Sequence, residues 1–323
     1  MASPADYDKN TLPDLDECAR WLTRHLQKQA SVGEQAQVTQ LEALKGGFWS
    51  RAYGCLINGE PTVVRFAWDG EGFDIDSQAA QLQGAGFAVP QVFDWGPTTT
   101  QGGSPCWYAL SKRYFGRFPD DLSPADAQAG TWCLTKILEG LVSIEPPNQR
   151  IYWWQQENSS APAPSSWRER LTGSLRSNTP SHPEYPTDTA QRGRMAFDEL
   201  LEACPERRDM VHGDLLYHNV LLTPQLDGVE AVFSWKCSTL GDHFYDVAWC
   251  LFWGEYHAGV DPDVVLEWLQ RVPYPDPLMH DWPTRVRCYQ LHIALTHLEW
   301  FVQTDDADML QWTAARIEDL LKP

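Results

Sequence analysis

A carboxylate and a carboxamide stand five residues apart in the segment Val211-His212-Gly213-Asp214-Leu215-Leu216-Tyr217-His218-Asn219-Val220-Leu221-Leu222. The run Gly228-Val229-Glu230-Ala231-Val232-Phe233-Ser234-Trp235 follows, after a turn around Pro224. Two short apolar runs on either side of a Pro- and Gly-containing turn predict a hairpin. Asp214 and Asn219, on the loop before that hairpin, are therefore the first candidates for chemistry.

The pattern His-Gly-Asp-x-x-x-x-Asn resembles the catalytic loop of kinase-like folds. The later run Gly241-Asp242-x-x-x-Asp246-Val247-Ala248 is similar to the signature that follows that loop. On these motifs the chain is identified as a member of the aminoglycoside phosphotransferase family. Further segments fall in the family's order, so the resemblance covers most of the chain: Gly47 to Tyr53, Val63 to Arg65, Val89 to Val92, Leu110 to Arg113, Ser166 to Arg168 and Arg287 to Arg316.

The resemblance implies the α+β class and a bilobal, protein-kinase-like fold. A small N-terminal lobe with an antiparallel sheet, residues 1–115, would bind nucleotide. A large, mainly helical C-terminal lobe, residues 116–323, would carry catalysis and substrate binding.

Residue patterns agree with a small sheet in the first part of the chain. Apolar residues at helical spacing after Asp14 predict a helix over 15–25. The pair Asn58-Gly59 accepts positive φ at both positions and predicts a tight hairpin turn. Composition predicts strands at 38–44, 52–57, 62–67, 91–95 and 107–112, with a helix at 74–83.

The second part has the pattern of helices and long loops. Ser123 with Pro124 predicts a capped helix start, and residues 146–186, rich in Pro, Ser and Asn, predict loops around a short helix that begins near Ser166. Further helices are expected at 195–204, 246–256, 263–271, 285–304 and 308–321.

Charge and composition limit the classes of ligand that the protein is expected to bind. The 323 residues include 25 basic and 44 acidic side chains, so the net charge is −19. This charge disfavours nucleic acid and anionic membrane surfaces and favours cationic ligands, although many cytosolic proteins are simply acidic. The eight scattered cysteines indicate reduced thiols, and we find neither a leader nor an apolar run of about 18 residues. We therefore expect a cytoplasmic protein that acts as a monomer.

The resemblance also implies roles for the loop residues. Asp214 would be the catalytic carboxylate that takes or orients the proton of an alcohol, with ATP or GTP as the phosphoryl donor. Asn219 would bind Mg²⁺. The alternative for Asp214 is a surface carboxylate that caps a helix, and His212 is interpreted as a structural hydrogen-bonding group.

The nucleotide site implied by the resemblance lies in the N-terminal lobe. Its cofactor-binding residues would be Gly47, Ser50, Arg51, Arg65 and Ser111. The hairpin from Gly46 to Tyr53 would cover the phosphates, although Gly-Gly turns are common without that role. Arg65 stands where most kinase-like enzymes carry Lys, with Asp74 or Asp76 as its ionic partner.

Ser234 departs from the family pattern. The family's strand ends in an Asp that binds Mg²⁺, and a hydroxyl cannot supply that charge. The chain is then an inactivated variant, a pseudokinase, or an enzyme that uses another cation such as Lys236, whose side chain would face the metal position if the segment were extended. The alternative for Lys236 is a solvated loop lysine. In the family, Asp242 helps shape the loop and Asp246 is structural, so neither is expected to replace the ligand.

Candidate acceptor-binding residues are Asp305, Asp306, Asp308, Glu299 and Trp300, although the Asp cluster also fits a helix-helix turn with a cap. The sequence thus predicts a magnesium-dependent phosphotransferase that acts on a hydroxyl of a small, cationic, aminoglycoside-like molecule, in antibiotic resistance. One alternative is an impaired kinase or pseudokinase that binds nucleotide or another ligand. The other is a kinase that acts on a peptide hydroxyl.

Overall fold

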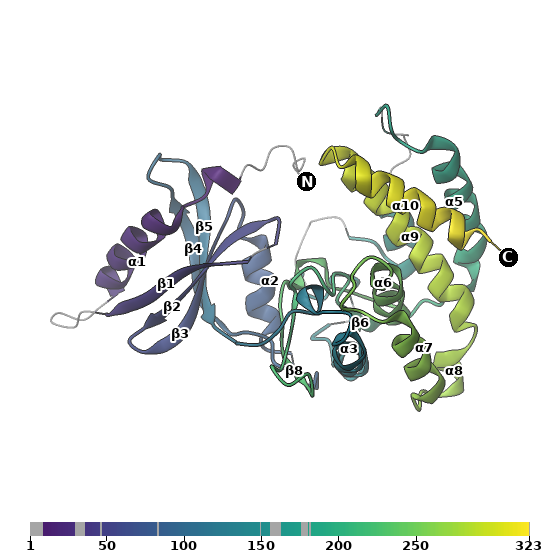
Figure 1. Cartoon of the computed structure of the whole chain (residues 1–323), viewed down its shortest axis with the longest axis horizontal. Helices are drawn as coiled ribbons and strands as arrows, with labels where there is room; N and C mark the ends of the chain where they lie inside the picture. Colours follow the sequence, from purple (N-terminus) through teal and green to yellow (C-terminus); the bar gives the residue numbers. More distant parts are fainter. Residues whose placement is uncertain are drawn as a thin grey trace.

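The computed structural model describes residues 9–29, 36–45, 47–82, 84–148, 150–155, 163–175, 180 and 182–322. A strand-rich lobe is followed by a mainly helical lobe, which confirms the expected α+β, bilobal class (Figure 1). The boundary between residues 115 and 116, which stays a prediction, falls after the last strand of the first sheet. Within the described residues, every helix is too short or too polar to cross a bilayer.

One antiparallel sheet forms the first lobe, in the order β1-β2-β3-β5-β4. Its strands are β1 Val38–Leu44, β2 Ser50–Ile57, β3 Glu60–Ala67, β4 Val92–Thr99 and β5 Pro105–Lys112. As expected, Asn58 and Gly59 make the β2-β3 turn, with φ of 52° and 87°.

Two helices lie on opposite sides of this sheet (Figure 1). Helix α1, Leu15–Gln29, buries Trp21 and Leu22 against Val64 and Phe66. Helix α2, Glu71–Ala79, faces the other side, where Phe73 packs with Ala109. Because side chains alternate along a strand, β3 serves both cores and leaves Arg65 at the edge of the second one.

The second lobe contains the remaining helices of the described residues and two short two-stranded sheets. Its helices are α3 Ala127–Val142, α4 Trp167–Ser174, α5 Thr187–Leu200, α6 Phe244–Gly254, α7 Pro262–Arg271, α8 Asp276–Met279, α9 Trp282–Gln303 and α10 Ala307–Leu320. The strands are β6 Asp209–Val211, β7 Val220–Leu222, β8 Val229–Val232 and β9 Thr239–Gly241. The second lobe also has the 3-10 turns η3 Pro119–Asp121, η4 Leu201–Ala203 and η5 Trp235–Cys237, whereas η2 Lys9–Thr11 belongs to the first lobe.

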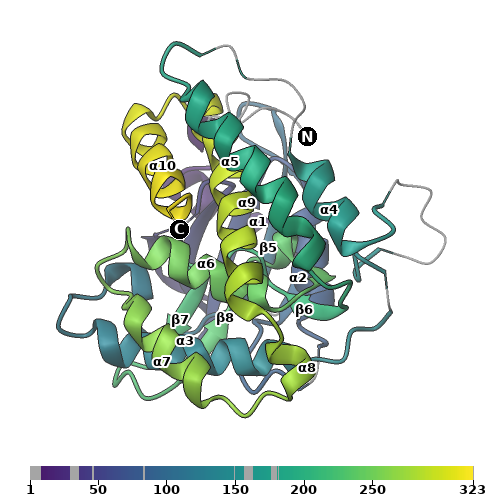
Figure 2. The same cartoon turned by 90° about the vertical axis from the view of Figure 1, so that its right-hand side faces the viewer.

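Helix α9 lies at the centre of the helical lobe, between α5, α6 and α10 (Figure 2). All residues of α6 are buried, so its only acidic side chain, Asp246, enters the core and meets the loop after β6. Strand β6 pairs with β9, and β7 pairs with β8 as the predicted hairpin.

Several predicted boundaries were wrong. Helix α3 begins at Ala127, because Ser123 donates its hydroxyl to Asp126 within a preceding turn and caps no helix. Helix α2 begins at Glu71 and ends at Ala79, earlier than expected. Helix α5 begins at Thr187, because its polar first half carries little apolar periodicity. Ser166 does cap α4, where its hydroxyl accepts a hydrogen bond from the N–H of Glu169.

Parts of three predicted segments lie outside the described residues. They are Gly46 in the hairpin predicted to cover the phosphates, Gln83 at the end of the helix predicted at 74–83, and 149, 156–162, 176–179 and 181 in the loops predicted over 146–186.

Candidate active site

The loop after β6 has an unusual backbone. Leu216, Tyr217 and His218 have φ of 78°, 50° and 64°, a left-handed region that is costly for residues other than glycine. The Asp120 carboxylate stabilises this arrangement by accepting hydrogen bonds from the N–H groups of Tyr217 at 2.7 Å and His218 at 3.0 Å. The loop that carries the motif is therefore fixed from a turn about a hundred residues earlier in the chain.

Asp246 holds the start of the same loop. Its two carboxylate oxygens accept hydrogen bonds from the N–H groups of His212, at 2.7 Å, and Gly213, at 2.8 Å. His212 is fully buried, and its Nε2 donates to the carbonyl of Phe233 at 2.9 Å. Burial lowers the pKa of His212 to about 4, so the ring is neutral and acts as a structural group, as expected.

Asp214 and Asn219 contact each other directly. The Asn219 amide donates to the Asp214 carboxylate at 2.9 Å and to its carbonyl at 2.8 Å, which leaves the Asn219 carbonyl oxygen for another partner. Burial raises the pKa of Asp214 to about 8, opposed by the Asn219 hydrogen bond and reinforced by the charges of Asp120 and Asp246. This carboxylate caps no helix; it lines a cleft.

The cleft has a volume of about 870 Å³ and takes side chains from both lobes. Four of the five residues predicted to bind nucleotide line it: Gly47, Ser50, Arg65 and Ser111. Arg51 does not, because its guanidinium donates to the carbonyl of Leu12 and to the side chain of Asn10. The volume is in the range of sites for small molecules and cofactors.

Arg65 has one of its two predicted partners. Its guanidinium lies 2.7 Å from the Asp76 carboxylate, whereas Asp74 accepts from Gln78. The second oxygen of Asp76 accepts a hydrogen bond from the N–H of Trp235 at 2.8 Å. One buried carboxylate, that of Asp76, therefore contacts residues of both lobes.

The position expected to bind Mg²⁺ lacks negatively charged ligands. Ser234 lines the cleft with a left-handed backbone, φ 62° and ψ 63°, and Asn219 offers one amide oxygen. These are two neutral oxygens, whereas protein-bound Mg²⁺ usually takes one or two carboxylates besides phosphate oxygens. Both oxygens of Asp246 and of Asp76 are already engaged. The residues present therefore do not fit a Mg²⁺ ion held by the protein.

Lys236 does not reach that position, and the extended conformation predicted for its segment was wrong. Trp235–Cys237 forms a 3-10 turn, in which residues two apart do not share a face. The Lys236 ammonium lies 3.2 Å from Asp69 and 3.3 Å from Glu71, near the start of α2. It is a partly buried cation that joins the two lobes.

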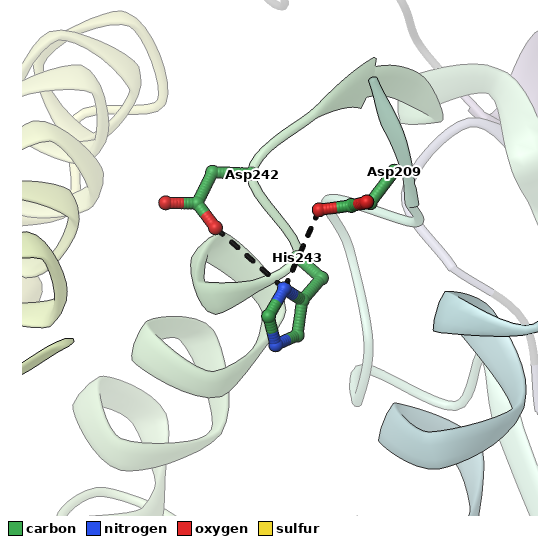
Figure 3. A group of neighbouring side chains, drawn as sticks. All are labelled: Asp209, Asp242 and His243. Atoms are coloured by element: carbon green, nitrogen blue, oxygen red, sulfur yellow. Dashed lines mark ion pairs between the residues drawn. The ribbon is translucent and has the colours of Figure 1, made fainter. Parts of the chain in front are cut away.

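Asp209, Asp242 and His243 form a cluster away from the cleft (Figure 3). Nδ1 of His243 lies 3.5 Å from Asp209 and 3.6 Å from Asp242. Arg207 pairs with Asp209, and Arg285 donates twice to Asp242. Two guanidinium groups thus balance two carboxylates, so the cluster has no excess negative charge with which to attract a divalent cation.

The roles expected for Asp242 and Asp246 are exchanged in the structure. Asp242 pairs with Arg285 and accepts from the hydroxyl of Tyr289, so it is the structural carboxylate. Asp246 binds the backbone of the loop and shapes it.

Of the predicted acceptor residues, the structure brings only Trp300 to the cleft, where it contacts Phe48 and Trp49 at 5.2 Å between ring centroids. Asp306 caps α10 through the N–H of Met309. Asp305 and Asp308 are exposed, and none of Asp305, Asp306, Asp308 and Glu299 lines the cleft.

Two residues of the site, Asp120 and Arg170, belong to no motif in the sequence. Asp120 lies in a turn with no motif, and its role depends on backbone angles that sequence does not reveal. Arg170 lines the cleft from α4, two residues beyond the segment Ser166 to Arg168.

Comparisons with known proteins agree with this geometry. Residues 40–280 match the model of the phosphotransferase enzyme family. Hygromycin-B 4-O-kinase of Escherichia coli is 24% identical over 290 residues, which cover 88% of this chain and 81% of that protein. The crystal structure of aminoglycoside phosphotransferase APH(4)-Ia superposes with a TM-score of 0.74 at 20% identity, over 95% of this chain and 98% of that one.

A thermostable mutant of APH(4)-Ia in ternary complex with AMP-PNP and hygromycin B has a TM-score of 0.70 at 20% identity, over 93% of this chain and 97% of that one. The match to the family model confirms the family predicted from the sequence motifs. The chain belongs to the phosphotransferase enzyme family, among the relatives of the aminoglycoside phosphotransferases.

Proposed function

We propose that this protein transfers the γ-phosphoryl group of a nucleoside triphosphate, ATP or GTP, to a hydroxyl of a small molecule. The observation that carries the proposal is the position of Asp214. Its carboxylate is oriented by Asn219 in a cleft that Ser50 and Arg65 also line. A carboxylate beside a phosphate-binding hairpin is the arrangement that phosphoryl transfer requires.

In the proposed reaction, the acceptor oxygen attacks the γ-phosphorus, and the bond between that phosphorus and the bridging oxygen breaks. The alcohol proton passes to Asp214, and the nucleoside diphosphate leaves with the bond electrons. Arg65, fixed by Asp76, would neutralise phosphate charge. Asp214 accepts a proton only when it is ionised. Because its pKa is raised to about 8, the reaction rate depends on the fraction of Asp214 that is ionised at the pH of the assay.

Phosphoryl transfer can be tested by nucleoside diphosphate release with a panel of hydroxyl compounds, in wild type and Asp214→Asn. The variant should lose about 10²- to 10⁴-fold in turnover, which is the usual contribution of a positioned base. Equal turnover in both proteins would exclude Asp214 as the base. Size-exclusion chromatography and cell fractionation check the predicted monomer and cytoplasmic location.

A second candidate is a nucleotide-binding protein with little or no turnover, and Ser234 is the observation that favours it. A hydroxyl replaces the charge that would balance the phosphates. Calorimetric titration with nucleotide, with and without Mg²⁺, distinguishes the two functions when turnover is measured on the same sample. Binding without turnover, also in Ser234→Asp, supports the second function.

A further inference from the structure

The helical side of the cleft differs from a site for a polycation. Its wall comes from α4, α6 and α9; we call it the acceptor wall, and its side chains include Trp167, Arg170, Tyr245, Trp249, His292 and Trp300. No Asp or Glu of these three helices is among the described residues that line the cleft. A molecule with several ammonium groups therefore finds no fixed carboxylate on this wall, despite the chain's net charge of −19.

Most polar atoms of the acceptor wall are already engaged. Tyr245 donates its hydroxyl to Nδ1 of His292 at 3.0 Å, since Nε2 of that ring is 3.1 Å from the carbonyl of Leu171 and must carry the proton. Ser174 and Thr296 donate to backbone carbonyls of their own helices. Burial and the charge of Arg170 lower the pKa of His292 to about 3, so this histidine is neutral.

Arg170 is the exception on this wall. Its Nε is buried without a hydrogen-bond partner, and no carboxylate within the described ranges pairs with its guanidinium. The neighbouring Arg168 on the same helix, by contrast, pairs with Glu202 at 3.2 Å and donates to the carbonyl of Cys204. The carboxylates that do line the cleft, those of Asp76, Asp121 and Asp214, form no ion pair with Arg170. A guanidinium that is partly withdrawn from water, borders a cleft and has no ion pair among the described residues is suited to bind an anion.

The rest of the wall is aromatic. Trp249 donates its N–H to the carbonyl of Leu215, and Trp167 donates to the hydroxyl of Tyr289. Both indoles border the cleft but are only 4% and 2% exposed, so they offer little open surface to a ligand. Trp300 adds a further indole at the cleft, against Phe48 and Trp49. Surfaces of this kind stack on flat, apolar molecules.

Building on the proposed function, we propose that the acceptor is a flat, apolar hydroxyl compound that carries an anionic group, which Arg170 binds, and not the polycationic amino-sugar expected from the family resemblance. Binding orients the acceptor by its anionic end and leaves its hydroxyl to approach Asp214. A carboxylate is the anion that best matches the planar guanidinium.

Three phenols of nearly equal size test this proposal: 3-(4-hydroxyphenyl)propionate, its amide and tyramine, with hygromycin B as a polycation. Dissociation constants are measured by ligand-observed NMR titration, with and without AMP-PNP. We expect wild type to bind the carboxylate about tenfold or more tightly than the amide and tyramine, as for one charge-assisted hydrogen-bonded pair.

The variants address Arg170 itself. Arg170→Gln should reduce affinity for the carboxylate to that for the amide, Arg170→Lys should retain part of the preference, and the control Arg271→Gln on the surface of α7 should retain all of it. Tighter binding of tyramine or hygromycin B than of the carboxylate would overturn the proposal. So would an Arg170→Gln variant that loses AMP-PNP affinity and keeps the carboxylate preference, because the guanidinium would then serve the nucleotide.

These titrations measure acceptor binding alone. Absence of phosphoryl transfer would count against the proposed function and leave the acceptor class as it is measured here.

Discussion

The Asp76 carboxylate accepts the N–H of Trp235 at 2.8 Å while it pairs with Arg65 at 2.7 Å. Helix α2 of the first lobe is thus joined to the residue that directly follows Ser234. The cation expected at the phosphates and the position expected at the metal are therefore fixed relative to each other by one buried side chain.

Restoring an acidic residue at Ser234 should restore a metal site. Ser234→Asp supplies the missing carboxylate next to the oxygen of Asn219, so Mg²⁺-dependent nucleotide turnover should rise by orders of magnitude. The measurement is nucleoside diphosphate release as a function of Mg²⁺ concentration.

Ser234→Asn is the matched control, because it adds a ligand oxygen without the charge. It should gain little, and an equal gain in both variants would mean that charge is not what the site lacks. If Ser234→Asp gains no turnover, then Ser234 does not limit Mg²⁺-dependent turnover.

The pKa of Asp214, about 8, predicts a particular pH dependence of stability. An unfolded Asp loses its proton near pH 3.9, so between about pH 4 and 8 the folded chain binds the extra proton. The free energy of unfolding contributed by this group therefore falls as pH rises through that window. Asp214→Asn has no such proton and should become progressively more stable than wild type from pH 4 to 8.

Urea unfolding at pH 5, 7 and 8.5 checks the Asp214 prediction. A stability difference between Asp214→Asn and wild type that stays constant across these pH values would contradict it.

Removal of the Asp246 carboxylate should loosen the loop that carries Asp214. Asp246→Ala leaves the buried N–H of His212 and that of Gly213 without acceptors, at a cost of about 1–3 kcal/mol for each unmet group. We expect a lower free energy of unfolding together with lower turnover. The surface variant Glu267→Gln on α7 serves as the control for a lost carboxylate, and similar behaviour of the two variants would contradict the role of Asp246.

Lys236 should contribute to the contact between lobes and not to catalysis. Lys236→Met removes its pairs with Asp69 and Glu71, which are about half exposed, so the loss of stability should stay near or below about 1 kcal/mol. Any turnover that persists in excess chelator should be unchanged in this variant. Its disappearance would place the Lys236 ammonium at the phosphates after all.

The sequence predicted the loop and the fold well, because spacing is conveyed directly by residue order. The hairpin of β7 and β8 and the Asn58-Gly59 turn are local features, and both have the predicted form. The position of Ser234 could also be predicted, since it lies two residues after the short strand β8.

Hydrogen bonds between residues far apart in the sequence could not be predicted in this way. Asp120 binds Tyr217 and His218 across almost a hundred residues, and nothing in the local pattern of residues 119–121 predicts that contact. The extended conformation predicted at Lys236 was wrong because Ser234, two residues after the end of β8, has a left-handed backbone and leads into a 3-10 turn. Sequence periodicity contains no information on such a reversal.

The contact of Trp300 with Phe48 and Trp49 has an energetic consequence for the movement of the lobes. Trp300 belongs to α9, and Phe48 and Trp49 lie between β1 and β2, so any widening of the mouth exposes indole and phenyl surface to water. Exposing that apolar surface to water is unfavourable, so these aromatic contacts favour the spacing of the two lobes seen in this structure. Any ligand whose entry requires a wider mouth must overcome this free-energy cost.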